Sequence, residues 1–183
     1  LSNPRTRSSS CRSYNPDSFR STAMSSAGRK EAICRQAIAR AGAGGNRSPL
    51  DFVRALGDPM MPVAAGIAKT YTGTLVLAGG TQMLSVAAVL KGMDLPVPRV
   101  ATTCYVRDDR SANFSEVAES IGVAVSYIDP DFGELGHSGL ARYCIGEVKE
   151  GMGAGGAMLL AWLMGFSPEA IRKKILHTVH AYA

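Results

Sequence analysis

The chain has 183 residues, of which 46% are hydrophobic and 19% are charged, with 20 glycines and a formal net charge of +5. This length suits one globular domain, and a glycine-rich, aromatic-poor composition is typical of a soluble α/β protein. Residues 1–40 carry eight basic and two acidic side chains, whereas residues 41–183 carry 12 basic and 13 acidic ones. The greater part of the chain therefore lacks the basic surface expected of a nucleic-acid-binding protein.

The cysteines are widely spaced, with no C-x-x-C pair and no histidine pair nearby; they are Cys11, Cys34, Cys104 and Cys144. This spacing indicates neither a zinc site nor a disulfide framework, and it favours reduced thiols in a cytoplasmic protein. Residues 1–22 are rich in Ser and Arg, as transit peptides are, but Leu1 is not an initiator Met. We therefore expect residues 1–26 to be a disordered or non-native leader and residues 27–183 to belong to one domain.

The first predicted elements are helices. Apolar residues at positions 33, 37, 38 and 41 recur at helical spacing, and the glycines of residues 42–45 end that helix. In the following segment, Ser48 has the character of an N-cap and Pro49 suits the first helical position. A short helix is thus expected to run to Leu56, where Gly57, Asp58 and a proline interrupt it.

The middle of the chain alternates between strand and helix patterns. Residues 74–78 form a compact apolar run, typical of a central parallel strand, which ends at Gly79 and Gly80. After it we expect a helix at 81–91, a strand at 99–106, a helix at 113–120, a strand at 122–128, and closing helices at 153–164 and 168–180. This order predicts a doubly wound, mostly parallel, Rossmann-like sheet with flanking helices.

Two long uncharged stretches, residues 70–90 and 151–168, must be weighed as membrane spans. Glycine-rich turns interrupt both, which leaves each apolar run with about half of the roughly 20 residues that a spanning helix needs. A buried strand and buried helices are therefore favoured, and no membrane partner is expected.

The most informative segment is 149–157 (KEGMGAGGA), where Glu150 stands directly before a glycine-rich turn that opens an apolar helix. Gly151 and Gly153 let the backbone approach a ligand, free N–H groups at a helix start favour phosphate, and Glu150 is placed to accept a proton. The alternative is a glycine-lined helix that packs closely on a neighbour, with Glu150 in solvent. Local physics leaves both interpretations open.

The same segment matches the dinucleotide pattern G-x-G-x-x-G through Gly151, Gly153 and Gly156. A dinucleotide-binding oxidoreductase would need an apolar strand before the pattern and an acidic residue about 20 positions after it. The preceding residues 142–150 are polar, and no acidic residue follows Glu169, so this function is a remote alternative.

Two further glycine turns are candidate ligand sites. Gly79, Gly80 and Thr81 follow the best strand, at the end where open α/β sheets bind ligands, although Thr81 as a helix N-cap is an equal alternative. Gly57 and Asp58 form a similar turn that adds a carboxylate, and we expect His137 to reach the same edge from a loop. His177 and His180 share a helix face without an evident third ligand, so we expect no metal site there.

Taken together, these motifs resemble the nicotinate-nucleotide:dimethylbenzimidazole phosphoribosyltransferase family, especially its archaeal and cyanobacterial-like branch. The similarity spans about residues 29–178 and rests on the order of residues 48–60, 76–84, 101–103 and 148–156. Members of that family transfer phosphoribose from nicotinate mononucleotide to 5,6-dimethylbenzimidazole, which gives nicotinate and α-ribazole 5′-phosphate for the lower ligand of cobalamin. The resemblance implies that Glu150 is the general base, that Lys30 contacts phosphate, and that Gly79 and Gly80 line the nucleotide pocket.

The chain also departs from the family pattern. Bacterial members have Asp where this chain has Ala78, and Gly where it has Lys149. The family's upstream phosphate loop and first strands have no counterpart in residues 1–26, so we expect a C-terminal part of the enzyme, and a non-catalytic oligomeric homologue is the main alternative. The resemblance implies small-molecule substrates, a homodimer, and neither a cofactor nor a metal.

Overall fold

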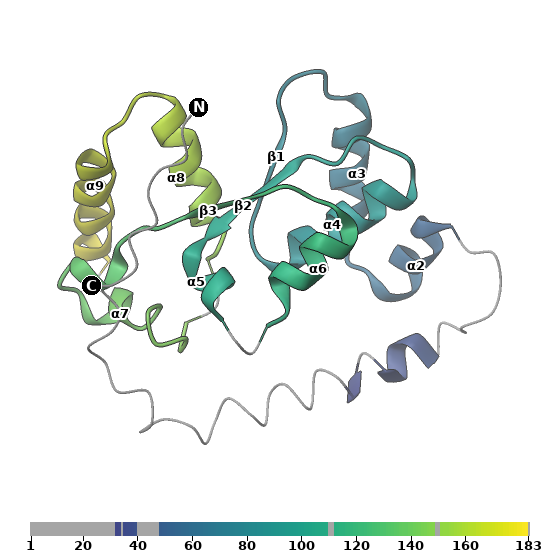
Figure 1. Ribbon diagram of the computed structural model, residues 1–183, viewed down its shortest axis with the longest axis horizontal. Helices are drawn as coiled ribbons and strands as arrows, with labels where there is room; N and C mark the ends of the chain where they lie inside the picture. Colours follow the sequence, from purple (N-terminus) through teal and green to yellow (C-terminus); the bar gives the residue numbers. More distant parts are fainter. Residues whose placement is uncertain (1–31, 34, 40–47, 110–111, 149–150, 183) are drawn as a thin grey trace.

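The protein is built around a three-stranded parallel sheet. The computed structural model describes residues 32–33, 35–39, 48–109, 112–148 and 151–182 (Figure 1). Within them, β1 (Val76–Ala78), β2 (Arg99–Thr103) and β3 (Val125–Ile128) pair in sequence order, all parallel. The predicted parallel α/β architecture with flanking helices is therefore confirmed.

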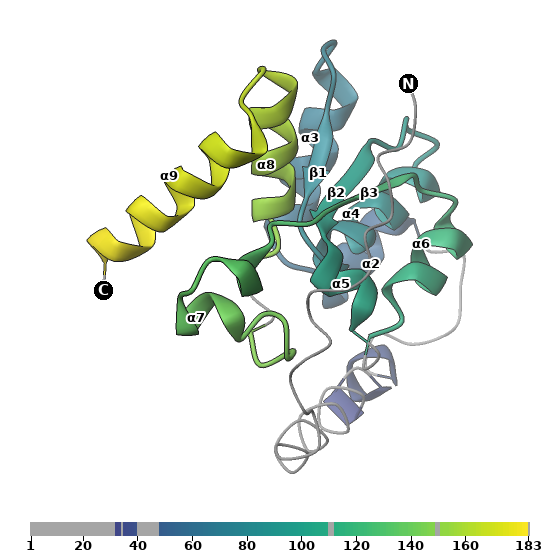
Figure 2. The same cartoon turned by 60° about the vertical axis from the view of Figure 1, so that its left-hand side comes forward.

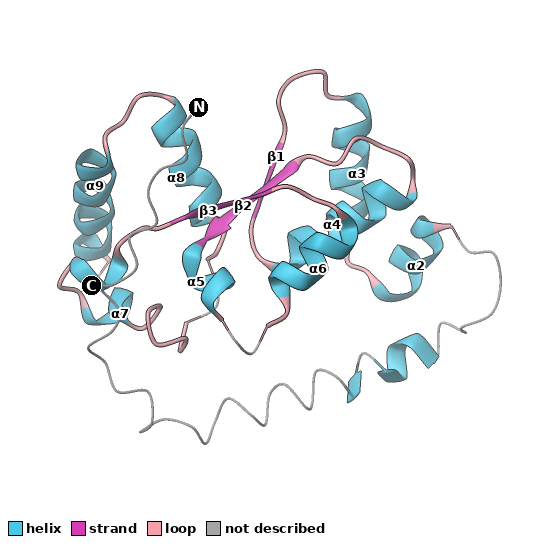
Figure 3. Cartoon of the chain, in the orientation of Figure 1, coloured by secondary structure: helices cyan, strands magenta, loops and turns pink. Residues whose placement is uncertain are grey.

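Helices precede, connect and follow the strands (Figure 3). Before the sheet lie α2 (Pro49–Leu56) and α3 (Met60–Thr70); between strands lie α4 (Thr81–Gly92), α5 (Cys104–Asp108) and α6 (Phe114–Ile121). After β3 come a short 3-10 helix, η3 (Phe132–Glu134), then α7 (Ser138–Ala141), α8 (Ala154–Leu163) and α9 (Pro168–Ala181). α4 follows β1, α5 follows β2 and η3 follows β3, so these connections leave the sheet at the carboxyl ends of its strands.

Where β1 and β2 pair near the carboxyl end of β1, the two faces of the sheet carry side chains of different size. Leu77 and Val100 point to the face that α4 and α6 cover, where they belong to a core with Leu84 and Phe114. Because side chains alternate along a strand, the paired residues Ala78 and Ala101 point to the other face, against which α8 packs (Figure 2). The large side chains thus fill the core, while the small ones let α8 approach the strands closely.

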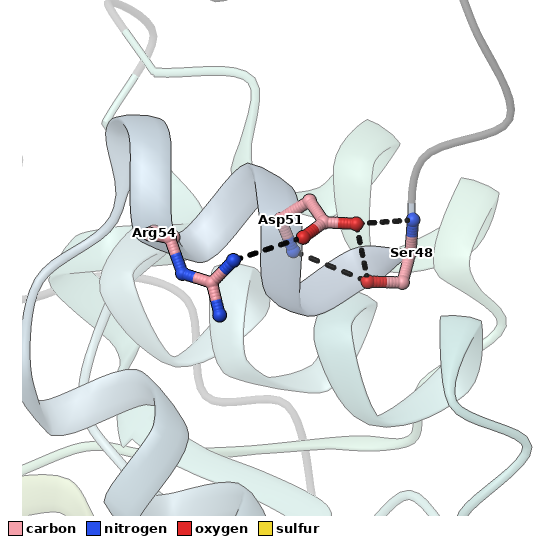
Figure 4. Close-up of polar contacts among 3 residues, drawn as sticks. All are labelled: Ser48, Asp51 and Arg54. Atoms are coloured by element: carbon pink, nitrogen blue, oxygen red, sulfur yellow. Dashed lines mark hydrogen bonds and ion pairs between the residues drawn. The ribbon is translucent and has the colours of Figure 1, made fainter.

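The start of α2 follows the sequence prediction. The Ser48 hydroxyl accepts a hydrogen bond from the Asp51 backbone N–H at 3.3 Å, and the Asp51 carboxylate accepts the Ser48 backbone N–H at 3.1 Å. This reciprocal pair is a capping box, with Pro49 at the first helical position (Figure 4). Arg54 Nη1 lies 3.3 Å from the Asp51 carboxylate and extends the network along the helix.

One helix and two strand boundaries differ from the prediction. The sequence pattern missed α3, because apolar residues and Pro62 obscure any amphipathic period there. The strand expected at 99–106 stops at Thr103, where α5 begins, and the one expected at 122–128 begins at Val125. Gly122 instead closes α6 in a left-handed conformation with φ 75°, which suits glycine.

Other predictions concern the chain outside the sheet. Residues 32–33 and 35–39 are helical, as predicted, whereas the expected leader at 1–26 lies outside the described residues. Among the helices that the structure describes, none is long and apolar enough to cross a bilayer. The uncharged stretches instead form β1 with α4, and α8.

The capping box gives a first prediction. Ser48→Ala removes the hydroxyl that accepts the Asp51 N–H, so we expect it to lower the free energy of unfolding by about 1 kcal/mol in a urea titration. Ser85→Ala is the matched control, because Ser85 is exposed inside α4 and alanine favours a helix interior. Equal stability of the two variants would show that the capping box does not hold α2.

Candidate functional site at the carboxyl edge of the sheet

The first glycine turn of the site follows β1. Gly79 is buried, and its backbone N–H donates to the Ala101 carbonyl at 3.0 Å, which ties the turn to β2. Gly80 is the N-cap of α4 and Thr81 is the first helical residue, with no side-chain capping bond. The alternative of Thr81 as N-cap is thus wrong, and its side chain is exposed at the carboxyl edge.

The second glycine turn, residues 151–153, leads into α8, whose own glycines lie directly on the strand ends. A methyl group on Gly155 would lie 2.2 Å from the Thr102 carbonyl carbon and 2.4 Å from its oxygen. One on Gly156 would lie 2.4 Å from the Ala78 Cβ. Since these are impossible contacts, the close-packing interpretation is correct for Gly155 and Gly156.

The residues just before α8 join the first two turns. A methyl group on Gly153 would lie 3.4 Å from the Ala78 carbonyl oxygen, and one on Gly80 would lie 3.8 Å from the Met152 Cβ. Met152 is buried, and the Thr103 hydroxyl donates to its sulfur at 3.0 Å. No sequence pattern pointed to Met152, which anchors this turn between β2 and the Gly79–Gly80 turn.

Hydrogen bonds within the chain limit which backbone N–H groups near the start of α8 can bind a ligand. The N–H groups of Ala154, Gly155 and Gly156 donate to the carbonyls of Gly151, Met152 and Gly153 at 2.9, 3.2 and 3.0 Å. These donors are already satisfied within the chain. Any anion bound here would therefore depend on the N–H groups of residues 151–153, and not on the first turn of α8 itself.

The third turn is held against the first by one side-chain contact. Gln82 donates from Nε2 to Asp58 Oδ2 at 2.9 Å, and Asp58 Oδ1 accepts the Met60 N–H at 2.7 Å. Both carboxylate oxygens thus have partners, which gives Asp58 a structural role in this structure. Gly57 and Asp58 also line an open cavity with a volume of about 410 Å³ between α2 and α3.

Aromatic side chains support the loop that leads from β3 to the second turn. The rings of Tyr105 and Phe132 lie 5.8 Å apart, and Tyr143 lies 5.1 Å from Phe132. The Tyr143 hydroxyl lies 3.3 Å from the position of a methyl group on Gly151. This cluster therefore fixes the turn from the β3 side.

Burial makes two nearby groups poor nucleophiles. It raises the pKa of the Cys104 thiol well above its usual value, and the charge of Asp129 adds to the shift. Burial likewise raises the pKa of Tyr105, helped by a hydrogen bond with Cys144. Both groups are protonated at neutral pH, so neither supplies an anionic nucleophile.

The remaining predicted site residues are not joined to these turns by described contacts. Glu150 and Lys30 lie outside the described residues. The ring of His137 lies 6.1 Å from that of His180 in α9, and its Nδ1 is buried without a hydrogen-bond partner in the described part of the chain. Among the described residues, no three His, Cys, Asp or Glu side chains are grouped to hold a metal ion.

The context of the G-x-G-x-x-G pattern differs from that of a dinucleotide site. Residues 142–148 form turns, whereas the fingerprint needs a strand immediately before its first glycine. The glycines instead serve the contact of α8 with β1 and β2. The structure thus gives no support to the oxidoreductase alternative.

Fold and site together define a parallel α/β protein with glycine turns gathered at the carboxyl edge of its sheet. No known family model matches the chain. It is, however, 42% identical over 174 residues to a UPF0284 protein of Thermococcus onnurineus (strain NA1), which covers 92% of this chain and 49% of the relative. A UPF0284 protein of Methanothermobacter thermautotrophicus is 44% identical over 135 residues, which cover 71% of this chain and 38% of that relative. One of Thermococcus gammatolerans is 46% identical over 151 residues, which cover 80% of this chain and 45% of that relative. UPF0284 proteins are thus homologues of this chain, which spans about half the length of the curated relatives it matches.

The contact of α8 with β2 gives a second prediction. Gly155→Ala would drive a methyl group into the Thr102 backbone, so we expect a loss of about 2–3 kcal/mol in the free energy of unfolding. Gly66→Ala is the matched control: a methyl group on Gly66, in α3, would have nothing within 4 Å, and we expect a gain of about 0.5–1 kcal/mol. Urea titrations of both variants test this, and a Gly155→Ala protein as stable as the parent would refute the close contact.

Proposed function

We propose that the intact protein transfers phosphoribose from nicotinate mononucleotide to 5,6-dimethylbenzimidazole or a related base. The observation that carries this proposal is the meeting of the Gly79–Gly80 turn with the Gly151–Gly153 turn at the carboxyl edge of a parallel sheet. Ligands of open α/β sheets bind at that edge, where backbone N–H groups and short side chains contact phosphate and ribose.

In this proposal the two turns bind the nucleotide through different groups. Residues 151–153 precede α8 and would offer N–H groups to the phosphate, whose negative charge the helix dipole favours. Thr81 is exposed beside Gly80 and would donate its hydroxyl to the sugar phosphate. Such fixed groups hold the anomeric carbon in place and so lower the entropic part of the barrier.

Glu150 directly precedes Gly151 in the sequence, and we assign it the role of general base. It would take the N–H proton of the benzimidazole while the other ring nitrogen attacks the anomeric carbon of the ribose. The bond between that carbon and the pyridinium nitrogen breaks, and nicotinate leaves with the bonding electron pair. The pyridinium is a good leaving group, so the step needs no metal ion or organic cofactor.

A non-catalytic homologue is the second candidate, and one observation favours it. The N–H groups of Ala154, Gly155 and Gly156 are already bonded within the chain, which leaves fewer donors for a phosphate than an open helix start would offer. Such a protein would bind the nucleotide weakly and would not turn it over.

The third prediction separates the two candidates. In the intact protein, Glu150→Gln should slow base exchange by about 10²–10⁴-fold, because the amide keeps the shape of the side chain but accepts no proton. Nucleotide affinity should change little. Single-turnover assays with nicotinate mononucleotide and dimethylbenzimidazole, together with calorimetric titration of the nucleotide, measure the two quantities.

Glu147→Gln is the matched control, because Glu147 is exposed and its carboxylate forms a 3.7 Å ion pair with the exposed side chain of Arg142. We expect it to exchange bases at the parental rate. If Glu150→Gln also kept that rate, the assignment of the base would be wrong. If the parent bound the nucleotide without turnover, the non-catalytic candidate would be correct.

A further inference from the structure

A second concave site lies beside α8 and α9. It is a cavity of about 130 Å³ between the end of β3, α8 and α9. Ile128 from β3, Leu159 and Trp162 from α8, and Ile171 from α9 supply apolar walls. No described residue of the three glycine turns lines it, so it is separate from the nucleotide site proposed above.

Two charged side chains contribute to this cavity. Asp129 and Arg172 both line it, and Arg172 forms an ion pair with the carboxylate of Asp131. That pair joins α9 to the end of β3. Asp129 is exposed, and its Oδ1 accepts the Asp131 N–H at 2.9 Å. Asp131 pairs with Arg172, and Asp108 pairs with Arg107, the other arginine whose charge acts on Asp129. Asp129 therefore leaves a net negative charge at this cavity.

The size and walls of the cavity suit one aromatic ring. An apolar cavity of about 150 Å³ in another protein takes up benzene, so about 130 Å³ holds a single six-membered ring. Trp162 lines the cavity and is 54% exposed, so its ring offers a flat apolar surface to a ligand. A planar ring would therefore be favoured there over a branched aliphatic group of equal volume.

We propose that this cavity binds a small planar aromatic cation, with its ring between Trp162 and Ile171 and its N–H donors on the Asp129 carboxylate. A cationic donor gains a charge-assisted hydrogen bond at Asp129, and a positive group near an aromatic face is attracted to it as well. An anionic ring of the same shape would meet the carboxylate and be repelled.

The experiment uses benzamidine as the cation and benzoate as its nearly isosteric anion. Trp162 is the only tryptophan of the chain, so its indole N–H gives a single signal in a nitrogen–proton correlation spectrum. For a ligand with so few atoms we expect a Kd of about 1 mM for benzamidine, and binding weaker by at least about tenfold for benzoate. The indole signal should shift with benzamidine and saturate.

Two leucines give the matched variants. Leu159 lines the cavity, whereas its neighbour Leu160 does not line it and is 59% exposed. Leu159→Phe should fill the cavity and weaken benzamidine binding by at least about tenfold, and Leu160→Phe should leave it unchanged. Asp129→Asn should bring benzamidine and benzoate to similar affinity and so tests the charge without changing the walls.

The outcomes decide the proposal. Selective binding of benzamidine that is lost in Leu159→Phe and loses its charge preference in Asp129→Asn would support it. Equal binding of benzoate, the absence of any saturable indole shift, or full binding by a folded Leu159→Phe protein would overturn it. Neither result bears on base exchange, which the Glu150 variant tests separately.

Discussion

The contact of α8 with the carboxyl ends of β1 and β2 is the constraint on which the site depends. Gly155 touches the Thr102 backbone and Gly156 touches Ala78, at distances that admit no side chain. This contact places the turn before α8 beside the Gly79–Gly80 turn, and it requires small residues on that face of the sheet. The opposite face carries the large side chains of the core. The close approach of α8 to the ends of β1 and β2 thus determines where the glycine turns lie.

Packing and binding make different demands on neighbouring glycines. Gly155 and Gly156 serve the helix–sheet contact, and their N–H groups are bonded within the chain. Residues 151–153 therefore provide whatever backbone recognition this turn offers, with Met152 buried as its anchor. The aromatic cluster of Tyr105, Phe132 and Tyr143 supports the same turn from the β3 side. A short backbone segment is thus held on two sides, as a preorganised binding turn must be.

The sequence predicted the features that local chemistry controls. Ser48 and Pro49 begin α2 as expected, and the apolar run before Gly79 forms β1. It did not reveal α3, whose apolar residues follow no clear period, or the early end of β2 at Thr103, which tertiary contacts decide. The contact between Gln82 and Asp58 joins residues 24 positions apart, and the cavity beside Trp162 needs β3, α8 and α9 together. Such long-range features have no local sequence signal.

Whether the glycine turns form one nucleotide site is tested most directly by a titration of the isotope-labelled protein with nicotinate mononucleotide. We expect the backbone amide signals of Gly79, Gly80, Gly151 and Gly153 to shift together along one saturation curve, because these turns are neighbours in space. Signals of Gly66 in α3 should stay in place. Shifts confined to one turn, or separate saturation curves for the two turns, would contradict a single site.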